Sequence, residues 1–283
     1  MNTKKESQDS SFAEKEFVFT EADFNDITNR IYKLAGIVLQ DHKKDMVYGR
    51  LARRIRALNF KKFSDYRDYL DSSQGKPELQ NFVNALTTNL TSFFREEHHF
   101  THFKQEIKSL MQADPRRRLR VWCSAASTGQ EPYSIAMSLD QVNVSAAAQD
   151  VKVLCTDLDT NVLAKCQDGI YDESHLEKMP HNLQKLYFKP LDSGRYEVTR
   201  KLKDLLIFKQ LNLLSNWPMR GPFDAIFCRN VLIYFDFETR MAIISKMMNI
   251  LRPKGVLYLG HSEAFPLEHD LVKTEGHTIF RKI

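Results

Sequence analysis

The segment from Leu119 to Ser134, LRVWCSAASTGQEPYS, constrains the fold of this 283-residue chain more than any other. An apolar, strand-like run ends there in the small residues Ser124–Gly129, and a helix-like pattern follows. Small side chains in such a turn let the backbone approach a ligand closely, as glycines do in dinucleotide-binding loops. A plain strand-to-helix connection has the same composition, so this segment alone identifies no ligand.

Strand-like and helix-like patterns alternate from Leu119 to the C-terminus. This alternation predicts a mostly parallel sheet with helices on both faces. Between Leu186 and Lys203 the segment YFKPLDSGRYEVTRK interrupts the pattern with two β-like runs around Asp192–Gly194, which predicts an inserted hairpin. The strand-like runs are LRVWCSA, KVLCTD, LLIFKQLN, FDAIFCRN, GVLYLG and HTIFRKI.

Helix-like patterns precede the sheet region, from Glu21 to about Ser92. Gly36, and Gly75 with Pro77, separate them and predict a small bundle of short helices. The residues before the first pattern are polar, charged and without periodicity, as in disordered segments. We therefore expect a disordered N-terminus (1–16), a helical domain (17–92) and a sheet domain (93–283) with an inserted β subdomain at about 186–204.

Composition excludes several classes of protein. The formal net charge of +5 is too small a basic excess to indicate nucleic-acid binding by itself. Four cysteines without C-x-x-C spacing are typical of buried thiols in a reducing compartment. No apolar run approaches the roughly 18 residues that span a bilayer, and the N-terminus lacks the apolar region of a signal peptide. We expect a cytoplasmic monomer that neither binds nucleic acid nor inserts into the membrane.

A second strand, VKVLCTDLD, ends in Asp157 and Asp159. An acidic residue at the end of the second strand of a doubly wound sheet can accept hydrogen bonds from ribose hydroxyls. The chain contains no G-x-G-x-x-G, which disfavours a dinucleotide. S-adenosylmethionine fits better, because it has adenine, ribose and an amino-acid tail but no phosphate. The alternative role for Asp157 is a helix N-cap, with Thr156 or Asp159 nearby.

Four segments resemble the CheR-type chemoreceptor glutamate methyltransferases. They are NALTTNLTSFFRE (84–96), SAASTGQEPYSIA (124–136), TDLD (156–159) and FDAIFCRNVLIYFD (223–236), and the resemblance runs from about Phe24 to the C-terminus. It implies an α/β fold, a class I S-adenosylmethionine-dependent methyltransferase (Rossmann-like) sheet domain with a small N-terminal helical domain and an inserted β hairpin subdomain. In that architecture a short last strand after the GHSE segment closes the sheet in the antiparallel direction.

The resemblance also implies an activity. The methyl group of S-adenosylmethionine would pass to glutamate side chains of bacterial chemoreceptors, giving γ-methyl esters and S-adenosylhomocysteine in chemotactic adaptation, with the protein recruited to receptor arrays. A glutamate with a reference pKa of about 4.3 is already ionised at neutral pH and needs no general base. Alignment of reacting groups can supply roughly 7 to 11 kcal/mol, so residues that bind and orient are expected to matter most.

Arg95 is the residue most directly tied to this chemistry. It follows Phe93 and Phe94, and a guanidinium there can hold a carboxylate in bidentate geometry. The resemblance places it at the methyl donor as a catalytic residue, together with Tyr234. Alternatives are a surface ion pair with Glu96 or Glu97 for Arg95, and a core position for Tyr234. The cofactor contacts that the resemblance implies are Asn89, Thr91, Arg95, Glu131, Asp157, Asn212, Leu213, Asn230 and Val231.

Several of these contacts have plainer alternatives. Asn89 and Thr91 would otherwise be helix caps, and Asn212 and Leu213 a turn asparagine and a core leucine. Glu131 matches the residue that contacts the amino group of the methionine tail. Gln130 stands where many members of the family have a second Glu, which halves the negative charge there.

Two further motifs limit the chemistry. The segment Cys228–Val231 lacks the Asn or Asp followed by prolines and an aromatic that amine-directed methyltransferases carry, which counts against methylation of amines or nucleobases. His98 and His102 are spaced i, i+4 on an expected helix, but no third ligand has clear spacing, so no metal site is expected.

The helix expected around Val47–Leu58 carries an apolar stripe of Val47, Leu51, Ile55 and Leu58. A basic helical face is usually only solvated. The resemblance instead places receptor recognition there, facing acidic methylation helices. The basic residues are Arg50, Arg53 and Arg56, which point away from the stripe, and Arg54 at its margin.

The hairpin segment Lys189–Arg195 is shorter than in family members that bind a receptor's C-terminal peptide. A tight turn leaves less room for a peptide to add as a strand, so we expect no dependence on a receptor pentapeptide. The runner-up among enzymes is a methyltransferase acting on nucleic acid or a small molecule. The alternative from another class is a catalytically silent adapter that binds S-adenosylmethionine and docks on receptors.

Overall fold

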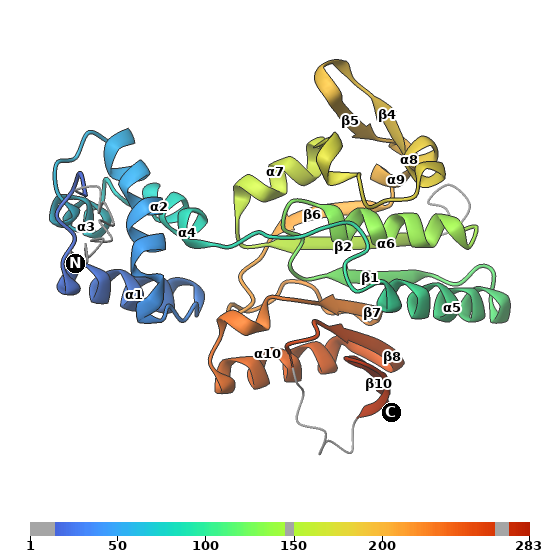
Figure 1. Ribbon diagram of the computed structural model, residues 1–283. Helices are drawn as coiled ribbons and strands as arrows, with labels where there is room; N and C mark the ends of the chain where they lie inside the picture. The colour runs from blue at the N-terminus through green and yellow to red at the C-terminus, as the bar shows by residue number, and fades with distance from the viewer. Residues whose placement is uncertain (1–14, 145–149, 264–271) are drawn as a thin grey trace, which may run out of the picture. The chain divides into compact units, whose positions relative to one another are not determined.

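A computed structural model gives the structure of the protein and describes residues 15–144, 150–263 and 272–283 (Figure 1). The chain forms two compact units. The first holds the residues up to Arg30 together with Gln40–Leu86, and the second holds Ile31–Leu39 and Thr87–Ile283. The segment expected to be disordered, 1–16, lies outside the described residues except for its last two.

The first unit is helical, as the sequence predicts. A reciprocal pair of hydrogen bonds between Thr20 and Asp23 caps the start of α1 (Glu21–Ala35), because each side chain accepts from the backbone N–H of the other. Gly36 ends that helix in the left-handed region, at φ +69°. The other helices are η1 (Asp41–Lys43), α2 (Lys44–Ala57), α3 (Phe63–Asp71) and α4 (Glu78–Leu86), and their core includes Phe24, Leu51, Phe63, Tyr66 and Phe82.

The second unit contains a seven-stranded sheet in the order β6-β2-β1-β7-β8-β10-β9. The pairs among β6, β2, β1, β7 and β8 are parallel, and β10 is antiparallel to both β8 and β9. All six predicted strands form, with the antiparallel closing strand. Their bounds are β1 (Leu119–Cys123), β2 (Val151–Asp157), β6 (Leu206–Gln210), β7 (Phe223–Cys228), β8 (Leu251–Leu259), β9 (Val272–Gly276) and β10 (Ile279–Lys282).

Alternating side chains of the central strands enter two cores on opposite faces of the sheet. Val121 packs in the cluster that contains residues of α5 (Glu97–Ala113) and α6 (Gln130–Gln141). Trp122, its neighbour in β1, packs in the other cluster with residues of α10 (Phe237–Ile250). The predicted cover of helices on both faces is therefore present, and the central strand β7 is buried along its whole length, whereas the edge strand β6 is mostly exposed.

The inserted region is a small antiparallel sheet in the order β3-β5-β4 (Figure 1, yellow). Its β4–β5 hairpin is the predicted one, and Ser193 and Gly194 turn the chain at φ +66° and +69°. A third strand, β3, directly follows α7 and pairs with β5 in the antiparallel direction. The sequence pattern does not predict this strand. The elements are α7 (Thr160–Asp168), β3 (Ile170–Asp172), η2 (Glu173–His175), α8 (His181–Tyr187), β4 (Phe188–Pro190), η3 (Asp192–Gly194), β5 (Arg195–Val198) and α9 (Arg200–Lys203).

One predicted helix is too long. The last helix-like pattern before the sheet region, PELQNFVNALTTNL (77–90), predicts a helix as far as Leu90, but α4 ends at Leu86. Thr87 and Asn89 bond instead through their side chains to Asp159, 2.7 and 3.0 Å away. Polar side chains with such an alternative partner favour leaving a helix. Within the described residues, none of the helices combines the length and apolarity that crossing a membrane requires.

Candidate active site

The residues with predicted roles gather where three parallel strands end. The register aligns Cys123 of β1 with Cys155 of β2 and Phe227 of β7, so the loops that follow leave the same edge of the sheet. The chain order reverses between β2 and β7 on either side of β1. Ligands of open α/β sheets bind at such a point, beyond the carboxyl ends of the strands.

The small-residue loop after β1 wraps around Asp157. The backbone N–H of Ser127 donates to one carboxylate oxygen at 2.8 Å, and that of Asp159 donates to the other at 2.9 Å. Burial raises the pKa of Asp157 to about 6, while these backbone bonds oppose the rise. A carboxylate has about four acceptor positions, so this one can still accept from a ligand hydroxyl beside its backbone donors. The alternative of a helix N-cap is wrong for Asp157, because Asp159 caps α7.

Asp159 also fixes the segment that carries Asn89. One oxygen caps α7 by accepting from Asn161 and Val162, and the other accepts from Thr87 Oγ1 and Asn89 Nδ2. The Asn89 carbonyl accepts from Ser127 Oγ at 3.0 Å. Asn89 therefore joins the loop after β1 to the helix after β2, and a cap on its own helix is not its role.

Arg229, directly after β7, is the buried centre of a charge network. Its guanidinium donates to Glu131 Oε2 at 2.7 Å and to the Arg95 carbonyl, and lies 3.4 Å from Glu96 Oε2. Burial raises the pKa of the Glu131 carboxyl, although Arg229 opposes it. Burial also works against ionisation of Glu96, yet Arg229 and His261 hold its pKa below the usual value.

The two carboxylates of this network are acceptors that fit the cation of a methionine tail. These carboxylates, Glu131 and Glu96, lie on either side of the Arg229 guanidinium. Glu96 Oε2 is buried without a hydrogen-bond donor among the described residues. An ammonium group supplies both a positive charge and donors. The predicted contact at Glu131 thus lies in a suitable place, with Glu96 beside it.

Arg95 lies on a strained turn before α5. Its neighbours Phe94 and Glu96 have φ values of +51° and +57°, and the Phe94 N–H is held by Ser134 Oγ at 2.9 Å. Arg95 Nη1 donates to the Leu90 carbonyl at 3.2 Å. The ion pair with Glu96 is loose, at 3.9 Å, and 33% of the Arg95 side chain is exposed. A guanidinium has five N–H donors, so this one is well supplied for a further acceptor.

The remaining predicted residues occupy the loops after β6 and β7. Asn212 donates from Nδ2 to the Leu34 carbonyl and accepts at Oδ1 from the Leu214 N–H, while Leu213 is buried. Asn230 has φ +58°, and Tyr234 lies half-buried in the 3-10 helix η4 (Leu232–Tyr234). The cofactor roles of this group stay predictions.

Sequence reasoning missed Arg229, Glu96 and Glu263. Glu263 is buried and accepts from backbone N–H groups of the loop after β7. Arg229 had a visible signal, since a charged residue follows the wholly buried strand FDAIFC. Buried charges require partners, so a carboxylate was to be expected opposite it. Its identity depends on topology, because Glu131 is 98 residues away.

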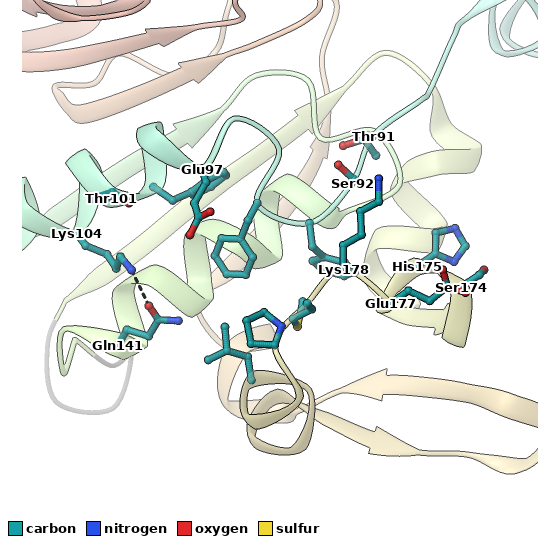
Figure 2. A pocket seen from close by; sticks show the side chains of 16 residues that line it. Thr91, Ser92, Glu97, Thr101, Lys104, Gln141, Ser174, His175, Glu177 and Lys178 are labelled. Atoms are coloured by element: carbon teal, nitrogen blue, oxygen red, sulfur yellow. Dashed lines mark hydrogen bonds between the residues drawn. The ribbon is translucent and has the colours of Figure 1, made fainter.

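A separate pocket of about 380 Å³ lies between α5, the end of α6 and Ser174–Leu183 (Figure 2). Phe93, Phe94 and Phe100 form part of its wall, and Lys104 bonds to Gln141 at 3.0 Å on one side. Thr91, a predicted cofactor contact, lines this pocket. Asp157 and Glu131 are not among the residues that line this pocket, and the cofactor role of Thr91 stays a prediction.

On α2 the predicted apolar stripe is buried at Val47, Leu51 and Ile55, while Leu58 follows the helix as its C-cap. Arg53 is exposed. The other basic residues have partners within the unit. Arg54 binds Glu78 through two nitrogens at 2.8 and 2.7 Å, Arg56 binds Glu16 at 2.5 Å, and Arg50 lies 3.5 Å from the Ala85 carbonyl.

The three histidines of α5 contact the end of the sheet. His98 and His99 both lie 3.2 Å from the His277 carbonyl, and His102 lies 3.0 Å from Tyr258 Oη. Burial lowers the pKa of His99 to about 3, so it is neutral at physiological pH. These contacts attach α5 to β8 and to the turn between β9 and β10.

Comparisons with known proteins decide the family. Residues 22–87 match the all-alpha domain of CheR methyltransferases, and residues 89–280 match their SAM-binding domain. The chain belongs to the CheR methyltransferase family. It is therefore an S-adenosylmethionine-dependent methyltransferase of chemotaxis, with the class I sheet domain and the helical N-terminal domain expected for it.

Relatives match over nearly their whole length. Chemotaxis protein methyltransferase 2 of Pseudomonas aeruginosa is 42% identical over 95% of this chain and 96% of its own. The chemotaxis protein methyltransferase of Escherichia coli is 44% identical over 92% and 91%. Among solved structures, the methyltransferase domain of bacterial CtHen1 shares 10% identity over 56% of this chain and 63% of its own, with a TM-score of 0.33.

Proposed function

We propose that this CheR methyltransferase esterifies glutamate side chains of chemoreceptors, forming γ-methyl esters and S-adenosylhomocysteine. Arg95 carries the proposal. It is a partly exposed cation on a turn whose shape is fixed by Ser134 and by the buried Arg229, next to the network that fits the methionine tail. A carboxylate acceptor complements that cation, whereas a protonated amine would be repelled by it.

The cofactor would be held by groups on each of the loops. Asp157 would accept from the ribose hydroxyls, and the network of Glu131 and Glu96 would bind the ammonium group. The remaining predicted contacts are Asn89, Thr91 and Arg95 before α5, Asn212 and Leu213 after β6, and Asn230 and Val231 after β7. When bound, S-adenosylmethionine supplies an activated methyl group on a sulfonium.

The work of the chain would then be positioning. The acceptor glutamate is already ionised at neutral pH, so no residue has to remove a proton. Arg95 would hold that carboxylate in line with the methyl group, with Tyr234 beside it. The bonds of Arg95 to Leu90 and of Phe94 to Ser134 support this role, because they fix the guanidinium before the acceptor arrives.

Receptor recognition would use the exposed face of α2. Arg53 and Arg56 are its most accessible cations, and Arg56 would exchange Glu16 for an acidic residue of the receptor. Arg54 is held by the buried Glu78, which supports a structural role beside the receptor contact predicted for it. The tight turn at Ser193 and Gly194 supports independence from a receptor's C-terminal pentapeptide. Titration with that peptide should show no micromolar binding.

The decisive experiment is transfer of radiolabelled methyl groups to receptor-containing membranes, followed by base treatment. We expect label that is released as methanol, since carboxyl methyl esters are base-labile. Label that resists base would indicate methylation of another group. Binding of S-adenosylhomocysteine without any transfer, under conditions in which the Escherichia coli relative transfers label, would support the silent adapter.

A further inference from the structure

Glu263 holds the backbone of the loop that follows β7. Its Oε2 accepts from the N–H groups of Gly260 at 2.6 Å and Asn230 at 2.8 Å. Its Oε1 accepts from those of Val231 at 2.8 Å and Leu232 at 2.6 Å. The residue is 3% exposed. All four acceptor positions of one buried carboxylate are thus used on main-chain donors.

The loop depends on this carboxylate for its shape. Asn230 is in the left-handed region, at φ +58°, which an L-residue adopts only at some cost. The N–H groups of Asn230, Val231 and Leu232 all donate to the Glu263 carboxylate, and these hydrogen bonds are partly or wholly buried. Without an acceptor there they would be left unpaired, which is unfavourable for buried donors.

Gly260 lets the two segments approach each other. A Cβ atom on residue 260 would lie 2.5 Å from Asn230 Nδ2, 2.8 Å from the Asn230 nitrogen and 2.8 Å from Glu263 Oε2. The next residue, His261, lies 3.2 Å from Glu96 Oε1 through its Nδ1. The segment Gly260–Glu263 therefore contacts both the loop after β7 and the carboxylate beside Arg95.

We infer that Glu263 is a positioning residue, which fixes the loop after β7 in the shape that binds S-adenosylmethionine. This inference rests on the proposed cofactor contacts of Asn230 and Val231, both of which Glu263 holds by their backbone. The position of Tyr234 also depends on Glu263, because the Tyr234 N–H donates to the carbonyl of Val231 at 3.2 Å and Glu263 holds Val231. Glu263 itself is placed behind this loop and acts through it.

The test compares Glu263→Gln with Asp224→Asn. The glutamine keeps the size but presents an NH₂ group to two N–H donors, so the loop should shift. Asp224 is a matched control, a buried carboxylate in β7 that accepts from the Arg120 N–H at 2.8 Å and pairs with Arg117. We expect the Kd for S-adenosylhomocysteine to rise by about ten- to a hundredfold in Glu263→Gln and by less than twofold in Asp224→Asn.

A second pair of variants leaves the carboxylate in place. Gly260→Ala adds the colliding Cβ, whereas Gly276→Ala adds one that meets Ile279 at an ordinary 3.5 Å. We expect weakened cofactor binding in the first variant alone, even if Glu263→Gln fails to fold. An unchanged Kd in a folded Glu263→Gln or in Gly260→Ala, or an equal rise in the controls, would overturn the inference. The Kd for S-adenosylhomocysteine is measured without receptor. Failure of receptor methylation would therefore refute the proposed function without affecting the inference about Glu263.

Discussion

The buried carboxylate of Asp157 should make cofactor binding depend on pH. Its pKa of about 6 comes from burial, and the ionised form is the better acceptor for ribose hydroxyls. Well below pH 6, each further unit of pH lowers the ionised fraction of Asp157 about tenfold. The affinity for S-adenosylhomocysteine at pH 5 should therefore be about tenfold lower than at pH 7. Asp157→Asn should lose this dependence.

The size of the mutational effect follows from the bonds that are lost. Hydrogen bonds to a charged group contribute about 1.5 to 3 kcal/mol, so Asp157→Asn should raise the Kd at pH 7 by at least about tenfold. Calorimetric titrations of both proteins between pH 5 and 8 give the two quantities together. An equal pH dependence in the wild type and in Asp157→Asn would assign the titration to another carboxyl, and an unchanged Kd would refute the ribose role.

Ionisation of the buried Asp157 carboxyl should also lower the stability of the folded protein at neutral pH. Its pKa is raised on folding from 3.8 to about 6, so the folded state binds the proton more tightly. The stabilisation from this group is therefore complete below pH 3.8 and is lost as the pH rises through 6. The loss at pH 7 is at most about 3 kcal/mol. Difference denaturation curves of wild type and Asp157→Asn at pH 5 and pH 7 measure it, and a difference independent of pH would contradict the argument.

Three further predictions concern arginines. Arg95→Ala should lower receptor methylation by about a hundredfold or more with little change in melting temperature, and near-normal turnover would exclude a role in orientation. Charge reversal of Arg53 and Arg56 to Glu should raise the KM for receptor and leave S-adenosylhomocysteine binding intact. The rise in KM should be smaller in high salt, which screens exposed charges. An unaffected KM would indicate that this helical face is only solvated. Arg54→Ala should lower the free energy of unfolding by about 3 kcal/mol because it removes the cation that pairs with the buried Glu78, against less than about 0.5 kcal/mol for Arg53→Ala; equal losses in chemical denaturation would refute the structural role of Arg54.

Much of the fold could be predicted from the sequence because its signals are local. The runs LRVWC and FDAIFC are apolar over the length of a strand, and both are buried as central parallel strands. The strand β9, VKTEG, was missed because it lies at the sheet edge, is mostly exposed and has no apolar periodicity. The end of α4 was misplaced because it depends on Asp159, which lies 70 residues beyond Asn89.

Some residues of the site could likewise be predicted from the sequence, and others could not. Asp157 could be proposed from its place at a strand end, but only the structure shows that Asp159 is the N-cap and leaves Asp157 facing the loop after β1. Arg229 and Glu263 act through partners that are distant in sequence, and a sequence without a known topology does not pair them. The family resemblance predicts which residues contact the cofactor, and the structure shows which neighbours hold those residues in place.

The segment Ile31–Leu39 has a practical consequence for dissecting this enzyme. It belongs with the second unit, where Tyr32 Oη donates to Asp236, the Val38 N–H bonds to the Tyr234 carbonyl, and Gly36 approaches Leu214 and Phe235. A truncation that begins at Thr87 would remove this segment along with the helical domain. It would strip a backbone partner from Tyr234 and uncover apolar side chains. An excised catalytic domain should retain these nine residues, because no single cut in the chain separates the two units.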